Sequence, residues 1–93
     1  MRYGYFAYEQ RKTSIKDMAF EFIGFAEVNP ESPEYDRSAE RLHDWALGLL
    51  TTCNHEAGYF VFNYGQVGED GEPEDILATL DVAWNGDREL AAT

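Results

Sequence analysis

The stretch TSIKDMAFEFIGFAEV, from Thr13 to Val28, decides the fold of this chain. Ser14 followed by Asp17 resembles a capping box, although Glu is more usual at the last position. Apolar side chains then recur at the i, i+3, i+4, i+7 spacing that places them on one face of a helix. They are Ile15, Met18, Ala19, Phe22, Ile23 and Ala26. The spacing therefore predicts a helix.

The same stretch has a second interpretation, as a β-strand. Apolar or small residues also occupy every second position, and Phe is common in sheets. These alternating residues are Met18, Phe20, Phe22 and Gly24. We prefer the helix and keep the strand as the alternative, because the choice changes which side chains between Met18 and Val28 are exposed.

A second helix is predicted further along the chain. Ser32 suits an N-cap, and Pro33 suits the first helical position because it has no amide hydrogen to leave unpaired. The apolar residues after it form one stripe. They are Tyr35, Ala39, Leu42, Trp45, Ala46, Leu49, Leu50 and Cys53. We expect a helix from Pro33 to Cys53 that ends at Asn54 or Gly58.

Three segments rich in aromatic and β-branched residues predict strands: Arg2–Glu9, Gly58–Gln66 and Ile76–Trp84. The resulting order is β-α-α-β-β. We expect a small α+β domain over residues 1–93, in which two helices pack on one face of about three antiparallel strands. Residues 87–93 should form a frayed tail. The oligomeric state is open, although Arg2–Glu9 as a flat edge strand could pair with another copy.

An acidic segment, GEDGEPED, lies between the last two predicted strands. It would form the loop of a hairpin, too long for a tight turn, and a helix starting at Pro73 is the alternative to the last strand. The segment lacks the D-x-D-x-D-G order of a calcium loop. It is either a solvated tip or a negatively charged prong that enters a basic groove. Its carboxylates are Glu69, Asp70, Glu72, Glu74 and Asp75.

A second acidic row runs along the predicted long helix. Asp36, Glu40 and Asp44 are four residues apart and therefore lie on one helix face. Arg37 and Arg41 run beside them, so a solvated face of mixed charge is the simpler interpretation. The row remains the second candidate for partner binding.

The charge of the whole chain excludes several functions. A net charge of -11 and a pI of about 4.3 argue against direct binding of nucleic acid or of an anionic membrane. Cys53 is the single cysteine, so no intrachain disulfide forms. We see no signal peptide and no apolar run of membrane-spanning length, and we expect a cytoplasmic protein.

No catalytic constellation stands out. Cys53 and His55 are too close in sequence for a well-oriented dyad, and His43 is nearly three helical turns from Cys53. There is no G-x-S-x-G motif and no phosphate-binding loop. We therefore expect neither an enzyme nor a bound metal or cofactor.

The sequence favours a small acidic inhibitor that covers a basic, nucleic-acid-binding surface of a partner enzyme. Its composition is similar to that of phage anti-restriction and anti-CRISPR decoys that act as DNA mimics, although no motif identifies a family. One alternative is an immunity protein or antitoxin that neutralises a basic nuclease. Another is an acidic housekeeping domain or an unrecognised enzyme.

Overall fold

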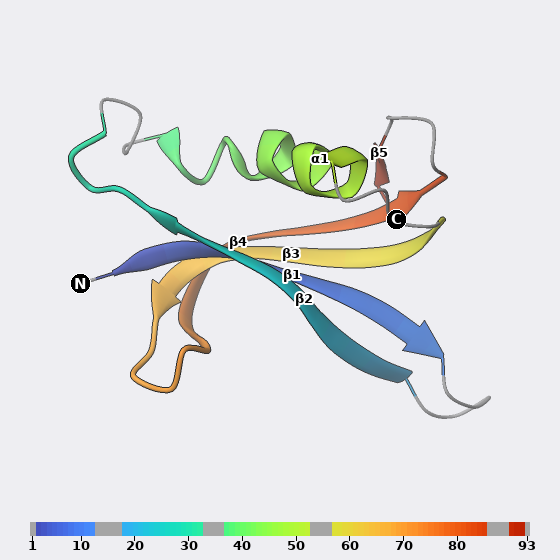
Figure 1. Ribbon diagram of the computed structural model, residues 1–93, viewed down its shortest axis with the longest axis horizontal. Helices are drawn as coiled ribbons and strands as arrows, with labels where there is room; N and C mark the ends of the chain where they lie inside the picture. The colour runs from blue at the N-terminus through green and yellow to red at the C-terminus, as the bar shows by residue number, and fades with distance from the viewer. Residues whose placement is uncertain (1, 13–17, 33–36, 53–56, 86–89, 93) are drawn as a thin grey trace.

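The computed structural model describes residues 2–12, 18–32, 37–52, 57–85 and 90–92. Its main element is an antiparallel sheet with four long strands and a short fifth strand at one edge, in the order β2-β1-β3-β4-β5. A helix, α1, lies across one face of this sheet (Figure 1). The elements are β1 (Tyr3–Lys12), β2 (Met18–Val28), α1 (Leu42–Thr52), β3 (Gly58–Val67), β4 (Pro73–Trp84) and β5 (Leu90–Ala92).

The predicted β-α-α-β-β order, with two helices on three strands, is wrong. The segment expected to be the first helix is the strand β2, which pairs with β1 along its length. The pairing contains a bulge: Ala7 lies opposite Gly24 and Tyr8 opposite Phe22, so that Ile23 is an extra residue in β2. The second element of the chain is therefore a bulged edge strand.

The register of β2 explains why the sequence pattern indicated a helix. Phe20 and Phe22 precede the bulge and Phe25 comes after it, and all three lie on the same face of the sheet by register. Ile23 instead packs against the core on the side of α1. The predicted helical stripe therefore combined side chains from both faces of the strand, since it joined Phe22 to Ile23.

The core lies between α1 and the sheet. Tyr5 stacks on Trp45 at 5.3 Å between ring centroids, and Trp45 meets Phe62 edge-on at 5.9 Å. Removing these side chains from water is the main source of stability for a chain of this size. The buried core residues are Ala7, Val28, Leu42, Ala46, Leu50, Phe60, Phe62, Tyr64, Val82 and Trp84.

The predicted long helix begins later than expected, at Leu42 instead of Pro33. Residues 37–41 form turns, and 33–36 and 53–56 lie outside the described residues. In a continuous helix the Ser38 carbonyl would accept the Leu42 amide. Here the Tyr5 hydroxyl donates to the Ser38 carbonyl at 2.7 Å, and the Leu42 amide donates to the Ala39 carbonyl at 3.4 Å. The turn before α1 is therefore tied to β1 by a side-chain bond, while the Leu42 amide bonds to the residue three positions earlier.

The other strands agree with the prediction in position but not in every role. β1 lies between β2 and β3, so it is an inner strand and not the predicted edge strand. β4 begins at Pro73, which places Glu74 and Asp75 in a strand and not in the loop. Near the chain end, where a frayed tail was expected over 87–93, Leu90–Ala92 pair with β4 as β5. Residues 87–89 and 93 are outside the described part of the chain.

Candidate interaction surface

The acidic segment forms a tight turn between β3 and β4, which we call the acidic turn (residues 68–72). The Gly68 amide donates to the Glu72 carbonyl at 2.8 Å, and the Gly71 amide donates to the Gly68 carbonyl at 3.0 Å. Gly71 has a φ of 82°, a backbone conformation that glycine adopts without strain. The prediction of a loop too long for a tight turn was therefore wrong. A turn closed by a left-handed glycine is common in three-residue hairpin loops.

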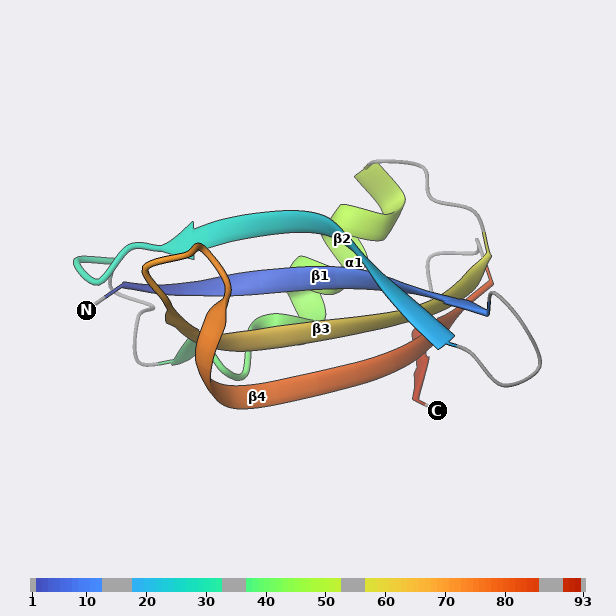
Figure 2. The ribbon, with the colours of Figure 1, turned by 90° about the horizontal axis from the view of Figure 1, so that it is seen from below.

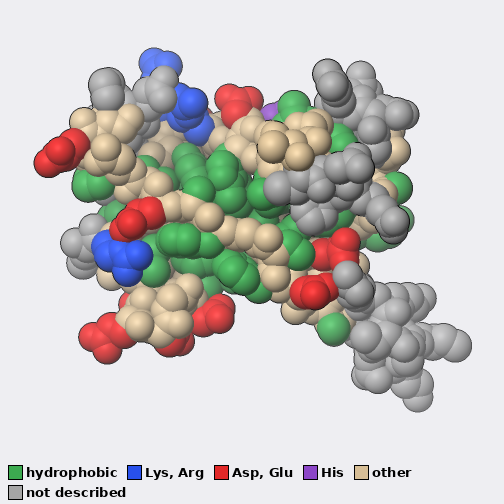
Figure 3. All heavy atoms as spheres, in the orientation of Figure 1, with side chains coloured by type: hydrophobic (Ala, Val, Ile, Leu, Met, Phe, Trp, Pro, Cys, Tyr) green, Lys and Arg blue, Asp and Glu red, His purple; other side chains and the backbone are tan. Residues whose placement is uncertain are grey.

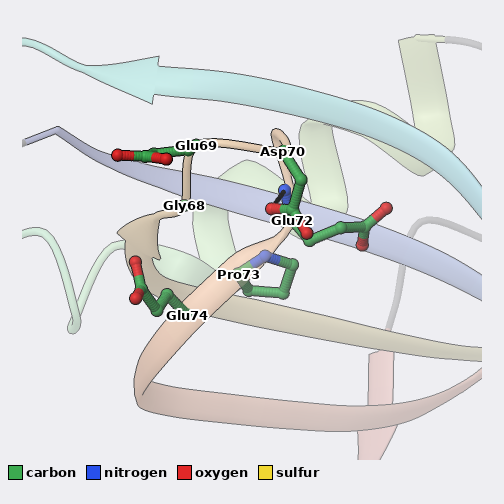
Figure 4. Close-up of a pocket in the computed structure, with 6 residues that line it drawn as sticks. All are labelled: Gly68, Glu69, Asp70, Glu72, Pro73 and Glu74. Carbon is green, nitrogen blue, oxygen red and sulfur yellow. Dashed lines mark hydrogen bonds between the residues drawn. The ribbon is translucent and has the colours of Figure 1, made fainter.

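The side chain of Asp70 stiffens this turn. Its Oδ1 accepts the Glu72 amide at 3.0 Å, as in an Asx turn (Figure 4). Three hydrogen bonds thus fix five residues, and the position of the carboxylates depends little on freely moving backbone.

Two irregularities bend the hairpin towards the sheet face that α1 leaves uncovered, which we call the open face. The pairing of β3 with β4 shifts between Tyr64 and Gly65 and again between Gln66 and Val67. A Cβ atom on Gly65 would overlap the carbonyl oxygen of Asp75, so the first bulge requires glycine. In Figure 2 the bent tip lies across β1, on the side away from α1.

The acidic turn lies close enough to β1 (Figure 2) for its charge to affect the pKa of Tyr8. Burial raises the pKa of the Tyr8 phenol, and the negative charge of Glu72 raises this pKa further. Figure 4 shows the side chain of Glu72 extended over β1. The turn is therefore part of the open face.

All five predicted carboxylates of this segment are exposed. Those of Glu69, Glu72 and Glu74 point in different directions around an open hollow (Figure 4). In Figure 3 acidic side chains project below the sheet, where Figure 1 shows the β3–β4 hairpin. Within the described residues none of the five forms an ion pair with a cation of the chain. No ion pair in this part of the chain therefore neutralises their charges.

The open face also carries exposed aromatic and aliphatic side chains, which we call the aromatic surface. The Tyr8 ring lies edge-on to Phe22 at 5.7 Å, and the fully buried Phe6 ring contacts Phe25 at 5.1 Å. The register of the sheet places the members of this surface on one side. They are Phe20, Phe22, Phe25, Tyr59 and Ile76, each at least 40% exposed.

The second acidic row lies elsewhere. Glu40 and Asp44 are exposed, but they belong to the layer of α1, across the sheet from the acidic turn (Figure 1). Asp36 lies outside the described residues. The structure therefore does not combine the eight predicted partner-binding residues into one surface, and any flat partner would meet the turn or the helix layer, not both.

Neither a metal site nor a membrane-spanning helix is found in the described part of the chain. No group of three His, Cys, Asp or Glu side chains there could hold a metal ion. His43 is exposed, with its Nδ1 3.9 Å from a carboxylate oxygen of Asp44. Cys53 and His55 lie outside the described residues. No described helix has the length and apolarity needed to cross a membrane.

Comparisons with known proteins add no functional information. No family model matches this chain, and no curated protein or solved structure does. The acidic turn and the aromatic surface are therefore the features from which a function can be inferred.

The aromatic surface is the feature that the sequence prediction missed. The signal was present in the alternation of Phe20 and Phe22, which supported the strand alternative for this stretch. A half-buried strand was the less favoured interpretation, and the predicted helix would have placed Phe22 on its buried stripe.

Proposed function

We propose that this protein is a small acidic inhibitor that covers a basic surface of a partner, at a site where the partner binds nucleic acid. One observation carries the proposal: five exposed carboxylates, at the acidic turn and the start of β4, have no ion pair within the described residues. They belong to a chain whose net charge is -11.

The physical reason is electrostatic. Crowded carboxylates repel one another, and a partner's Lys and Arg side chains relieve that repulsion. Long-range attraction also speeds the encounter with a basic protein, and it disfavours nucleic acid as the direct ligand. The hydrogen bonds of the turn fix its backbone before binding, which reduces the entropic cost of the complex.

The proposal is tested by capture of the partner from a lysate of the source organism, at low and at moderate salt. We expect a basic nucleic-acid enzyme in stoichiometric amount, displaced by added DNA or RNA. Recovery of a nuclease toxin would favour the immunity-protein alternative. If nothing is captured at either salt concentration, the inhibitor proposal is wrong.

Two variants with equal charge changes locate the binding carboxylates. Glu69→Gln with Glu72→Gln removes two charges from the acidic turn, and Glu40→Gln with Asp44→Asn removes two from the helix layer. The first pair should weaken binding of the captured enzyme by at least about tenfold, and the second by about twofold or less. Equal losses from both pairs would show that only total charge matters.

A further inference from the structure

We infer that the open face binds a basic amphipathic helix of the partner, with its apolar side on the aromatic surface and its Lys or Arg residues against the acidic turn. This inference depends on the proposed function and specifies which part of a partner is recognised. It combines two independent features of the same sheet face: exposed apolar side chains and uncompensated carboxylates.

The apolar half of the site is unusual for a free surface. Phe20 and Tyr59 are each 58% exposed, Phe22 is 52% exposed and Ile76 is 50% exposed. Several exposed apolar side chains on one face of a domain are typical of sites where another molecule binds. The acidic turn is the element that crosses this face among the described residues (Figure 2), and it leaves these side chains accessible.

The acidic half of the site lies directly beside the apolar half. Tyr8 lies between them, because its ring contacts Phe22 and the charge of Glu72 raises the pKa of its phenol. Asp81, which is exposed and opposite Val61 in the register, adds a carboxylate on the β4 side of the same face. A ligand bound on the aromatic surface would therefore lie beside negative charges of this protein. A ligand with cationic side chains along that side is favoured.

Charge disfavours a second copy as the occupant. Two-fold pairing would bring identical surfaces together, each from a chain of net charge -11 and each with its own acidic turn. Such an interface would place like charges at short range and lose affinity.

The shape of the surface favours a helix over an extended strand. A strand binds the edge of a sheet through its backbone, whereas the exposed side chains here project from the face. A sheet face is typically covered by helices, as α1 covers the other side of this sheet. Four strands at about 4.8 Å spacing give a surface wide enough for a helix of about 10 Å diameter.

The test uses synthetic peptides of Leu and Lys as probes, each about 18 residues long, which corresponds to a helix of about 27 Å. The first peptide has Leu at helical spacing. The second has the same composition with Leu and Lys alternating, which favours a strand. The third replaces every Leu by Ser and keeps the charge. We expect the first to bind at least about tenfold more tightly than the other two, measured by isothermal titration at moderate salt.

Variants of the protein then separate the two halves of the site. Phe20→Ser with Phe22→Ser should weaken binding of the helical peptide by at least about tenfold, and Glu69→Gln with Glu72→Gln should do the same. Glu40→Gln with Asp44→Asn is the matched charge control and should change binding by about twofold or less. Circular dichroism checks the fold, and Tyr59→Ser replaces the double Phe variant if that variant unfolds.

The other outcomes overturn this inference without removing the proposed function. Equal binding of all three peptides, or binding unaffected by the Phe variants, would mean that charge alone is recognised. Tighter binding of the alternating peptide would indicate a strand as the ligand. Self-association that depends on Phe20 and Phe22 would identify a second copy. Failure to bind any peptide, together with successful capture of a basic enzyme, would leave the inhibitor proposal intact and reject the helix.

Discussion

The two faces of the sheet differ in how many large aromatic side chains they leave exposed, although Phe6 on the open face is buried. On the face covered by α1, the aromatic rings of Tyr5, Trp45 and Phe62 contact one another, and Phe62 is fully buried. On the open face, Phe20 and Phe22 remain more than half exposed. Tyr5 and Phe62 come from the same kind of alternating strand as Phe20 and Phe22, so local sequence preference does not distinguish them.

This difference separates residues needed for folding from residues available for binding. Burial of an aromatic side chain stabilises the fold only when another part of the chain covers it. Among the described residues, the acidic turn is the element that crosses the open face (Figure 2). It adds charge there without burying Phe20, Phe22 or Tyr59. Substitutions on the two faces should therefore have different consequences.

The largest expected effect compares one Phe from each face. Phe62→Ala should lower the free energy of unfolding by about 3–5 kcal/mol, because it leaves a cavity in the core. Phe22→Ala should lower it by about 1 kcal/mol or less, because that side chain is already half in water. Urea unfolding measures both. Similar losses for the two variants would contradict the assignment of the faces.

A second comparison uses two glycines. Gly65→Ala should destabilise the protein by about 1–3 kcal/mol, because the new methyl group overlaps the Asp75 backbone at the bulge that bends the acidic turn. Gly48→Ala is the control in α1, where nothing lies within 4 Å of the new atom. It should stabilise by about 0.5–1 kcal/mol. A Gly65→Ala variant of unchanged stability would show that the bulge is not required.

Neutralising the acidic segment should have a smaller effect on stability. Replacing Glu69, Glu72 and Glu74 with Gln, and Asp70 and Asp75 with Asn, should change the unfolding free energy by no more than about 0.5 kcal/mol. Any change should be stabilising and largest at low salt, because repulsion is removed. Asn at position 70 keeps the oxygen that accepts the Glu72 amide. A large loss of stability would mean that these carboxylates are needed for folding.

The smallest expected effect concerns the pKa of Tyr8. Glu72→Gln should lower this pKa part of the way towards the ordinary tyrosine value, because burial, the larger cause, remains. Glu40→Gln is the control and should leave it unchanged. Ring chemical shifts followed by NMR through alkaline pH give the value. An unshifted pKa in the Glu72→Gln variant would place the acidic turn away from β1.

The same raised pKa has a consequence for stability against pH. The folded protein holds the Tyr8 proton more tightly than the unfolded chain does. The resulting stabilisation is fully present below the ordinary tyrosine pKa and is lost as pH rises through the higher folded value. Glu72→Gln should reduce this alkaline loss.

The sequence predicted the inner strands better than the edge of the sheet. Alternation located β1, β3 and β4, and the stripe around Leu42, Ala46 and Leu50 located α1. β2 was missed because it has apolar side chains on both faces, and a subset of them from the two faces falls at helical spacing. The start of α1 was missed because the apolar stripe continues through the turns at residues 37–41.

The candidate site was predicted only in its parts. The exposed carboxylates of the acidic segment were identified from composition, since a charge run between two strands stays in water. Their position over β1 depends on the bulge at Gly65 and on close packing that no local pattern encodes. The aromatic surface could be predicted only if β2 was first recognised as a strand.

The binding site is located most directly by an NMR titration of the isotope-labelled protein with the helical Leu–Lys peptide. If the open face binds the helix, the largest shifts occur there, at Tyr8, Phe22 and Tyr59 and in the acidic turn, with residues of α1 little affected. Shifts concentrated around Glu40 and Asp44 in the helix layer, with the open face unchanged, would contradict it.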